Sequence, residues 1–179
     1  MSRISLILTV PALTVVALCA GCSNPDPTKG YTTISQYRPD IKTVAVPIFR
    51  RGTYEYRRDI EFRLTEAVVK QIEAQTPYKV VDKGRADTLL TGTIQSIDPQ
   101  VLSFIPRTGR AREIQLRVIV DFTWKDLRGE GKLLVEKKNF PVAAEYIPEA
   151  PFLEDFFVGS EDAFDKMARL IVEQMAQPW

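Results

Sequence analysis

The segment from Glu113 to Trp124 places an apolar residue at every second position, and this pattern constrains the fold more than any other part of the chain. Successive side chains of a strand point to opposite faces, so the pattern predicts a long β-strand with one buried and one wet face. A polar turn with two glycines follows at Lys125–Gly131, and Lys132–Val142 is the predicted returning strand of a hairpin. We expect the buried face to carry Ile114, Leu116, Val118, Val120, Phe122 and Trp124.

Two amphipathic helices and three further strands complete the predicted layout. Apolar residues at helical spacing predict a first helix over Arg57–Ala74, and Ser160 is the predicted N-cap of a second. Strands are predicted at Ile41–Phe49, Tyr78–Val81 and Thr88–Ile97, the last continuing toward Phe104 and carrying Gly92 as a candidate bulge. This order predicts an α+β fold, a two-layer sandwich with two helices on one face of a mostly antiparallel sheet of four to five strands.

The N-terminus has the pattern of a secretory signal that ends in a lipidation site. Arg3 precedes an apolar stretch that is too short for a stable membrane span. The residues directly before Cys22 are small, so this segment can fit as a strand in the cleft of a peptidase. The Cys22 thiol is the nucleophile that accepts diacylglycerol. A soluble secreted protein cleaved near Ala20 is the alternative. Ser23, in place of an aspartate, favours the outer membrane under the enteric sorting rule.

These features divide the chain into three parts. We expect residues 1–21 to be the signal peptide and residues 22–40 to be the lipidated cysteine and a flexible tether. Residues 41–179 are expected to form a single α+β domain. The predicted location is the cell outer membrane, with the lipid-anchored domain facing the periplasm.

The composition removes most kinds of catalytic and metal site. The chain has no histidine, and its two cysteines are Cys19, lost with the signal, and Cys22, consumed by lipid. This excludes Cys–His and Ser–His–Asp catalysis and most zinc, haem and iron–sulfur sites. We therefore expect no metal, no cofactor and no enzymatic activity, and a hydrolase built on two carboxylates is the remaining enzymatic alternative.

The charge balance does not indicate a nucleic-acid partner. The whole chain has 24 Lys and Arg against 23 Asp and Glu, and the signal peptide removes Arg3. A general nucleic-acid binder would show a clear basic excess. The distribution of charge is therefore more informative than its total.

The best candidate binding site is the basic loop between two predicted strands. It combines the guanidinium groups of Arg107, Arg110 and Arg112 with the large apolar side chains of Phe104 and Ile105. Guanidinium groups bind phosphate oxygens in bidentate fashion, and the two apolar side chains suit acyl chains, so a phosphorylated glycolipid fits this combination. A solvated loop that happens to be basic is the alternative.

Two other surface features have both a functional and a structural interpretation. Phe62 and Val69 lie off the main apolar stripe of the first helix, either as a partner-facing strip or beneath a covering loop. A second basic cluster is either an anionic site or a set of salt bridges with Glu55, Asp59 and Glu61. This cluster contains Arg50, Arg51, Arg57 and Arg58.

Scattered motifs along most of the chain resemble a known family. A cysteine is followed by Gly30-Tyr31, then by the segment Ile41–Pro47 and the Arg57–Ala74 helix. Ala86–Gly92 and the strand that leads into Lys125-Asp126-Leu127-Arg128 come next, and a last helix ends at Trp179. This layout resembles a divergent branch of the lipopolysaccharide-assembly lipoproteins of the LptE type.

The resemblance implies a fold, a location and two partners. LptE-type proteins are outer-membrane lipoproteins with two helices against a four-stranded sheet. They sit as a plug inside the β-barrel translocon LptD, help that barrel to assemble, and bind lipopolysaccharide. Basic residues on loops at the tip of the plug take part in that binding, and Arg107, Arg110 and Arg112 match them by placement. The rival interpretation is a lipoprotein that regulates another periplasmic machine, such as a cell-wall synthase activator or a secretion-pore component.

Overall fold

The computed structural model describes residues 35–53, 55–129, 131–148 and 156–176. The predicted signal peptide, Cys22, most of the predicted tether and Trp179 lie outside the described residues. A compact unit begins at Ser35 and contains all the helices and strands named below. Tyr37 is already buried in this unit.

The long predicted strand is the centre of the antiparallel part of the sheet. It is β5, Ala111–Asp126, and it pairs with β4, Thr88–Phe104, on one side and with β6, Leu133–Tyr146, on the other. The predicted apolar face is buried from Leu116 to Trp124. β4 does continue to Phe104, and β6 runs beyond the predicted end at Val142.

Three short strands at the other edge add parallel pairs, so the sheet is mixed, while most of its pairing is antiparallel as expected from the sequence. β1, Thr43–Ala45, pairs in parallel with β4 and with β3, Lys79–Val80, and β2, Arg50–Arg51, pairs in parallel with β4. The six strands follow the order β3-β1-β4-β5-β6, with β2 also on β4. A helix lies between β1 and β3 along the chain. It carries the chain back to the end of the sheet at which β1 begins, so β1 and β3 run in the same direction.

Phe49 interrupts the strand predicted over Ile41–Phe49. Its side chain is buried against Gly92 of β4, where an added Cβ would lie 2.7 Å from the ring. Gly92 pairs regularly with Phe122 in the register of β4 and β5, so it is not the predicted bulge. Its missing side chain instead provides the space that the Phe49 ring occupies. The backbone N–H of Phe49 donates to Thr65 Oγ1 at 3.0 Å.

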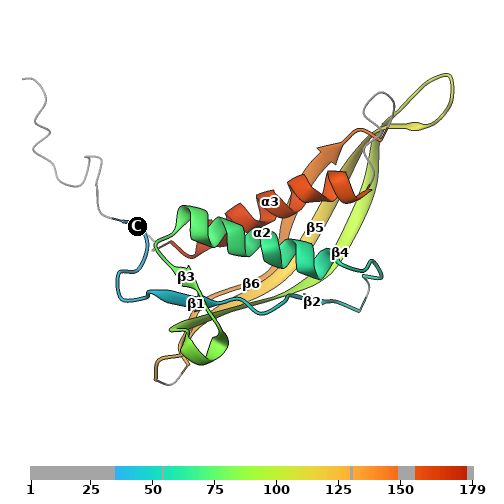
Figure 1. Cartoon of the computed structure of the whole chain (residues 1–179). Coiled ribbons are helices and arrows are strands. Elements are labelled where there is room, and N and C mark those ends of the chain that lie inside the picture. Colours follow the sequence, from blue (N-terminus) through green and yellow to red (C-terminus); the bar gives the residue numbers. More distant parts are fainter. Residues whose placement is uncertain (1–34, 54, 130, 149–155, 177–179) are drawn as a thin grey trace, which may run out of the picture. The chain divides into compact units, whose positions relative to one another are not determined.

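Two helices cover one face of the sheet, as predicted (Figure 1). α2 spans Ile60–Gln75 and buries the expected stripe. α3 spans Phe156–Gln174, so it begins before the predicted cap, Ser160. The Ser160 hydroxyl is buried inside the helix and donates to the carbonyl of Phe157 at 2.9 Å. The short 3-10 turn η2, Lys83–Arg85, links β3 to β4.

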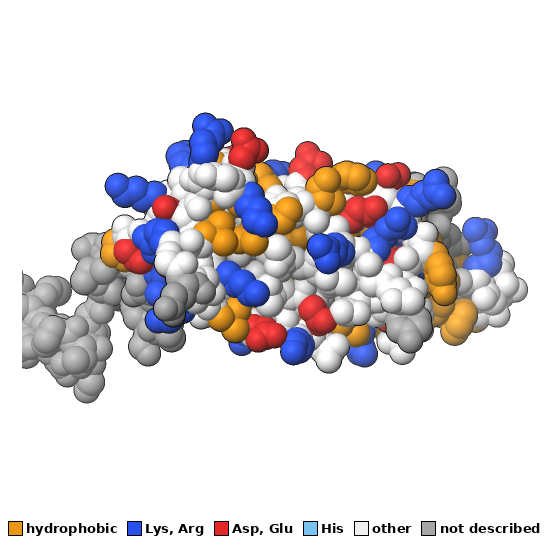
Figure 2. Space-filling model, turned by 90° about the horizontal axis from the view of Figure 1, so that it is seen from below, with side chains coloured by type: hydrophobic (Ala, Val, Ile, Leu, Met, Phe, Trp, Pro, Cys, Tyr) orange, Lys and Arg blue, Asp and Glu red, His pale blue; other side chains and the backbone are white. Residues whose placement is uncertain are grey.

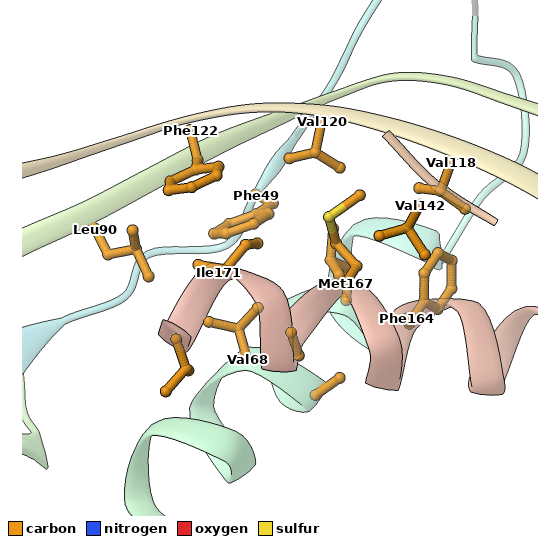
Figure 3. Packing of buried hydrophobic residues seen from close by; sticks show 14 of the residues in the cluster. Phe49, Val68, Leu90, Val118, Val120, Phe122, Val142, Phe164, Met167 and Ile171 are labelled. Carbon is orange, nitrogen blue, oxygen red and sulfur yellow. The ribbon is translucent and has the colours of Figure 1, made fainter. Parts of the chain in front are cut away.

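The core fills the space between the sheet and the helices. Figure 3 shows side chains of the sheet directed toward α3, with Val68 of α2 on the helix side of the same layer. Burying a large apolar side chain contributes about 1.5–3 kcal/mol, so this layer is the main source of stability in the described residues, which contain no cysteine. The labelled side chains are Phe49, Leu90, Val118, Val120, Phe122, Val142, Phe164, Met167 and Ile171.

Candidate functional site

The turn between β4 and β5 holds the predicted basic loop. The Ile105 N–H donates to the Arg110 carbonyl at 2.9 Å, and the Gly109 N–H donates to the Ile105 carbonyl at 2.9 Å. Gly109 has a φ of +67°, a conformation that favours glycine, and this closes the turn. The turn therefore brings Phe104 and the arginines together at one extremity of the sheet, although Arg112 already belongs to β5.

The three arginines of this turn are free to meet a ligand. Arg107, Arg110 and Arg112 are exposed, and their guanidinium groups form no ion pair or hydrogen bond within the described part of the chain. Phe104 beside them is 62% exposed, and Ile105 is half-buried. An exposed large aromatic ring next to unpaired cations differs from an ordinary solvated surface, where apolar side chains stand singly.

Other exposed apolar side chains gather at the same end of the molecule. Val101 lies opposite Ile114, and Ile114 lies opposite Tyr146, so the end of β6 reaches the same extremity. Gly159 of α3 packs so tightly on Tyr146 that an added Cβ would lie 2.4 Å from its ring. This places the first turn of α3 beside the end of β6. The exposed apolar residues of these segments are Val101, Leu102, Phe104, Ile147, Phe157 and Val158.

We call this end the tip and define it as residues 101–112 together with Ile147, Phe157 and Val158. The turn at its extremity projects beyond the helices in Figure 1. At the right-hand end of Figure 2, basic and hydrophobic side chains lie next to one another. The tip thus offers cationic and apolar groups on one surface. The sequence predicted the turn but not the contribution of α3 and β6. The strand register brings the end of β6 to the tip, and the packing of Gly159 on Tyr146 brings α3 there.

Two of the four arginines in the second basic cluster have a structural role. Arg51 pairs with Glu61 at 3.2 Å, and Arg57 pairs with the buried Glu55 at 3.1 Å, as the salt-bridge interpretation predicted. Asp59, the third predicted partner, has a φ of 69° at the start of α2, and the described residues give it no ion pair. Arg51 and Arg57 therefore support the framework next to the tip, whereas the described residues give Arg50 and Arg58 no ion pair.

Arg57 and Arg63 also fix the first turn of α3 beside the tip. The Arg57 guanidinium lies 4.4 Å from the ring centre of Phe156 and donates to the Ile97 carbonyl at 3.2 Å. The Arg63 guanidinium lies 5.0 Å from the ring centre of Phe157. Sequence reasoning missed these contacts, since the aromatic pair is far from both arginines along the chain.

The apolar strip predicted on α2 is partly realised. Phe62 is 51% exposed, whereas Val69 is half-buried. Phe62 is therefore not covered by a loop among the described residues, and the two side chains do not form a continuous exposed patch. Their role in partner binding stays a prediction.

The hollow on the open face of the sheet, about 390 Å³, has two carboxylates in its lining, Asp121 and Glu136. Asp121 accepts hydrogen bonds from Gln95 and from the Asn139 N–H, at 2.6 and 2.7 Å, and Glu136 pairs with Lys138 at 3.3 Å. Both carboxylates are thus already engaged, and this hollow is a weaker candidate site than the tip.

The described ranges also lack two features that would suggest other functions. Neither helix there has the length and hydropathy needed to cross a membrane. The same residues contain no group of three or more Cys, Asp or Glu side chains placed to hold a metal ion.

Comparison with known proteins identifies the family. The family model LptE, described as lipopolysaccharide-assembly, matches residues 41–177, well over half of the chain. No curated protein sequence matches the chain. Protein CT253 from Chlamydia trachomatis superposes with a TM-score of 0.52 at 9% identity, over 75% of this chain and 95% of that one. Protein XCC0632 from Xanthomonas campestris gives 0.50 at 11% identity, over 79% and 90%.

At such low identity, these two likenesses show a shared fold alone. The rare lipoprotein B from Shewanella oneidensis has 18% identity and a TM-score of 0.43, over 75% of this chain and 93% of that one. The fold and the tip together define a small two-layer α+β protein with an amphipathic, cationic end. The chain belongs to the LptE family of lipopolysaccharide-assembly lipoproteins, which is an assembly family and not a family of enzymes.

Proposed function

We propose that the chain is an outer-membrane lipoprotein, anchored through an acylated Cys22, that serves as the plug and assembly subunit of a lipopolysaccharide translocon. In this role it binds an LptD-like β-barrel and presents its tip to lipopolysaccharide. It performs no catalysis and needs no cofactor. The family membership supports the general role, and the tip supports the ligand.

The observation that carries this proposal is the coincidence of unpaired arginines and exposed apolar side chains at the tip. Arg107, Arg110 and Arg112 lack partners among the described residues, whereas Arg51 and Arg57 are held by carboxylates. Phosphate groups suit free guanidinium forks, and acyl chains suit the exposed Phe104 and its apolar neighbours. A phosphorylated glycolipid has both kinds of group in one molecule.

Binding of purified lipopolysaccharide tests this ligand. The triple variant Arg107→Glu, Arg110→Glu, Arg112→Glu of the purified mature lipoprotein should bind at least about tenfold more weakly at ~0.1 M salt, because it replaces charge-assisted contacts with repulsion. The matched control is Lys79→Glu, Lys83→Glu, Arg85→Glu, which makes the same charge change at three exposed positions outside the tip. Equal losses in the two triple variants, or no loss at the tip, would contradict the proposal.

The open face of the sheet supports a partner with a polar surface. Thr91 and Thr123 share a hydrogen bond of 2.9 Å between their hydroxyls, and Gln95 donates to Asp121 on the same face. A polar sheet face suits the polar lumen of a large barrel. Co-purification from detergent-solubilised membranes tests this partner. Recovery of a barrel of several hundred residues would support the plug, and recovery of a cell-wall synthase or a secretion pore would support the rival role.

A further inference from the structure

The segment Ser35–Asp40, which we call the strap, is docked on the domain although its sequence is that of a tether. In Figure 1 it enters at the end of the sheet opposite the tip. Tyr37 is only 8% exposed, and its ring meets the ring of Tyr78 edge to face with 5.8 Å between the centres. Tyr78 in turn lies 6.0 Å from Trp124. A tether that merely spans distance would not bury an aromatic ring in the core.

Hydrogen bonds fix the middle of the strap as well. The backbone N–H of Arg38 donates to the Tyr78 hydroxyl at 2.9 Å. Burial raises the pKa of this hydroxyl, so it stays protonated and neutral at ordinary pH. The strap therefore meets an aromatic wall through both a ring contact and a directional bond.

Arg128 holds the end of the strap. Its Nη2 lies 2.8 Å from Asp40 Oδ2 and 2.9 Å from Asp126 Oδ2, and its Nη1 donates to the Asp40 carbonyl. The turn that carries Arg128 is itself fixed, because the Leu127 N–H donates to the Asp87 carbonyl at 2.7 Å. One guanidinium thus joins the strap to the turn between β5 and β6.

We propose that Tyr78, Trp124 and Arg128 form an intramolecular docking site for the strap, which fixes the point where the membrane anchor leaves the domain at the end opposite the tip. Docking withdraws residues 35–40 from the predicted tether that starts at Cys22. An extended residue spans at most about 3.3–3.6 Å, so release of these six residues adds about 20 Å of reach. The change in reach from the membrane rests on the proposed lipidation of Cys22. The docking of the strap does not depend on that lipidation.

Amide hydrogen exchange of the full mature chain tests the docking. The variant Arg128→Gln removes the charged fork, and we expect the hydrogen-bonded amides of residues 37–41, those of Tyr37, Arg38 and Ile41, to exchange about tenfold to a hundredfold faster, in line with the loss of bonds to a charged group. Asp40→Asn should give a smaller increase, because the Arg128 bond to the Asp40 carbonyl remains, and the double variant should exceed Arg128→Gln by little, because Arg128→Gln already removes the shared contact. The amides of β5 should keep their protection.

The control is Arg85→Gln, which breaks an exposed ion pair with Asp82 away from the strap. It should leave exchange in residues 37–41 unchanged. Wild-type exchange rates in this segment for Arg128→Gln would overturn the docking site, as would an equal increase in the Arg85→Gln control. Because exchange is measured without lipopolysaccharide or a barrel, failure here is distinct from failure of the proposed function.

Discussion

At the scale of single residues, two glycines determine how closely the layers approach. Gly92 lies beneath the Phe49 ring, and Gly159 lies against Tyr146, with no room for a methyl group at either position. Gly92 allows an irregular segment to fill the core where the edge strand is interrupted. Gly159 allows the first turn of α3 to sit on the end of β6, next to the tip. Both glycines are needed for close approach and neither has a positive φ.

The substitution Gly92→Ala should destabilise the protein by about 1–3 kcal/mol, because the methyl group overlaps the Phe49 ring in a packed core. Denaturant unfolding measures this change. Gly84→Ala is the matched control, since nothing lies within 4 Å of its added Cβ, and it should be close to neutral. Equal stability of the two variants would show that Phe49 is not held over Gly92.

At the scale of elements, Thr65 connects α2 to the interrupted edge of the sheet. Its hydroxyl accepts from the buried Phe49 N–H and donates to the Glu61 carbonyl at 2.6 Å. The Phe49 N–H group thus finds its hydrogen-bond acceptor on a helix side chain and not on a neighbouring strand. The link helps to hold α2 above β2, close to the arginines that support α3.

Replacing Thr65 with valine keeps the shape but leaves the Phe49 N–H without its acceptor. We expect a loss of about 1–3 kcal/mol in the free energy of unfolding, the typical penalty of a buried unpaired donor. Thr65→Ser keeps the hydroxyl and should lose clearly less. If serine cost as much as valine in thermal or denaturant unfolding, the methyl group and not the hydrogen bond would be the important part of this side chain.

The strap should respond to acid. The hydrogen bond from Arg128 is the main cause that lowers the pKa of Asp40 and of Asp126, and the cation Arg38 adds to it. The pKa of Asp87 is lowered as well, chiefly by the backbone N–H of Lys42. Because these folded-state pKa values lie below the ordinary value of about 4, their stabilisation is present above that value and is lost as the pH falls through the lowered pKa.

Exchange in residues 37–41, corrected for intrinsic rates, should therefore be constant from about pH 7 to about pH 5 and should increase below about pH 4. In Arg128→Gln the same acid step should be smaller, because the main partner of both carboxylates has gone. A strap that stayed equally protected down to about pH 2 would show that the aromatic contacts alone hold it.

At the scale of the whole molecule, periodicity was enough to predict the layers but not all of their connections. The alternation in β5 predicted its buried face correctly, because side-chain direction in a strand depends only on position. The parallel strands β1 to β3 were harder to predict, since each is only two or three residues long and gains its register from tertiary contacts. The early start of α3 was missed because Ser160 resembles a cap but is buried within the helix.

The candidate site was predictable to a similar degree. Neighbours in sequence such as Arg107 and Arg110 necessarily share a turn, so their grouping needed no structure. Which arginines are free and which are paired depends on contacts between distant segments, as Arg57 with Phe156 shows. The contribution of Ile147 and Val158 to the tip likewise depends on the strand register and on the packing of α3.

The most direct test of the tip as a lipopolysaccharide site is photo-cross-linking in intact cells. A photoreactive phenylalanine analogue at Phe104 should cross-link to lipopolysaccharide, whereas the same analogue at Leu133, an apolar position exposed to a comparable extent but outside the tip, should not. Cross-links at Leu133 as strong as those at Phe104, or none at Phe104 in a protein that still reaches the outer membrane, would contradict this account.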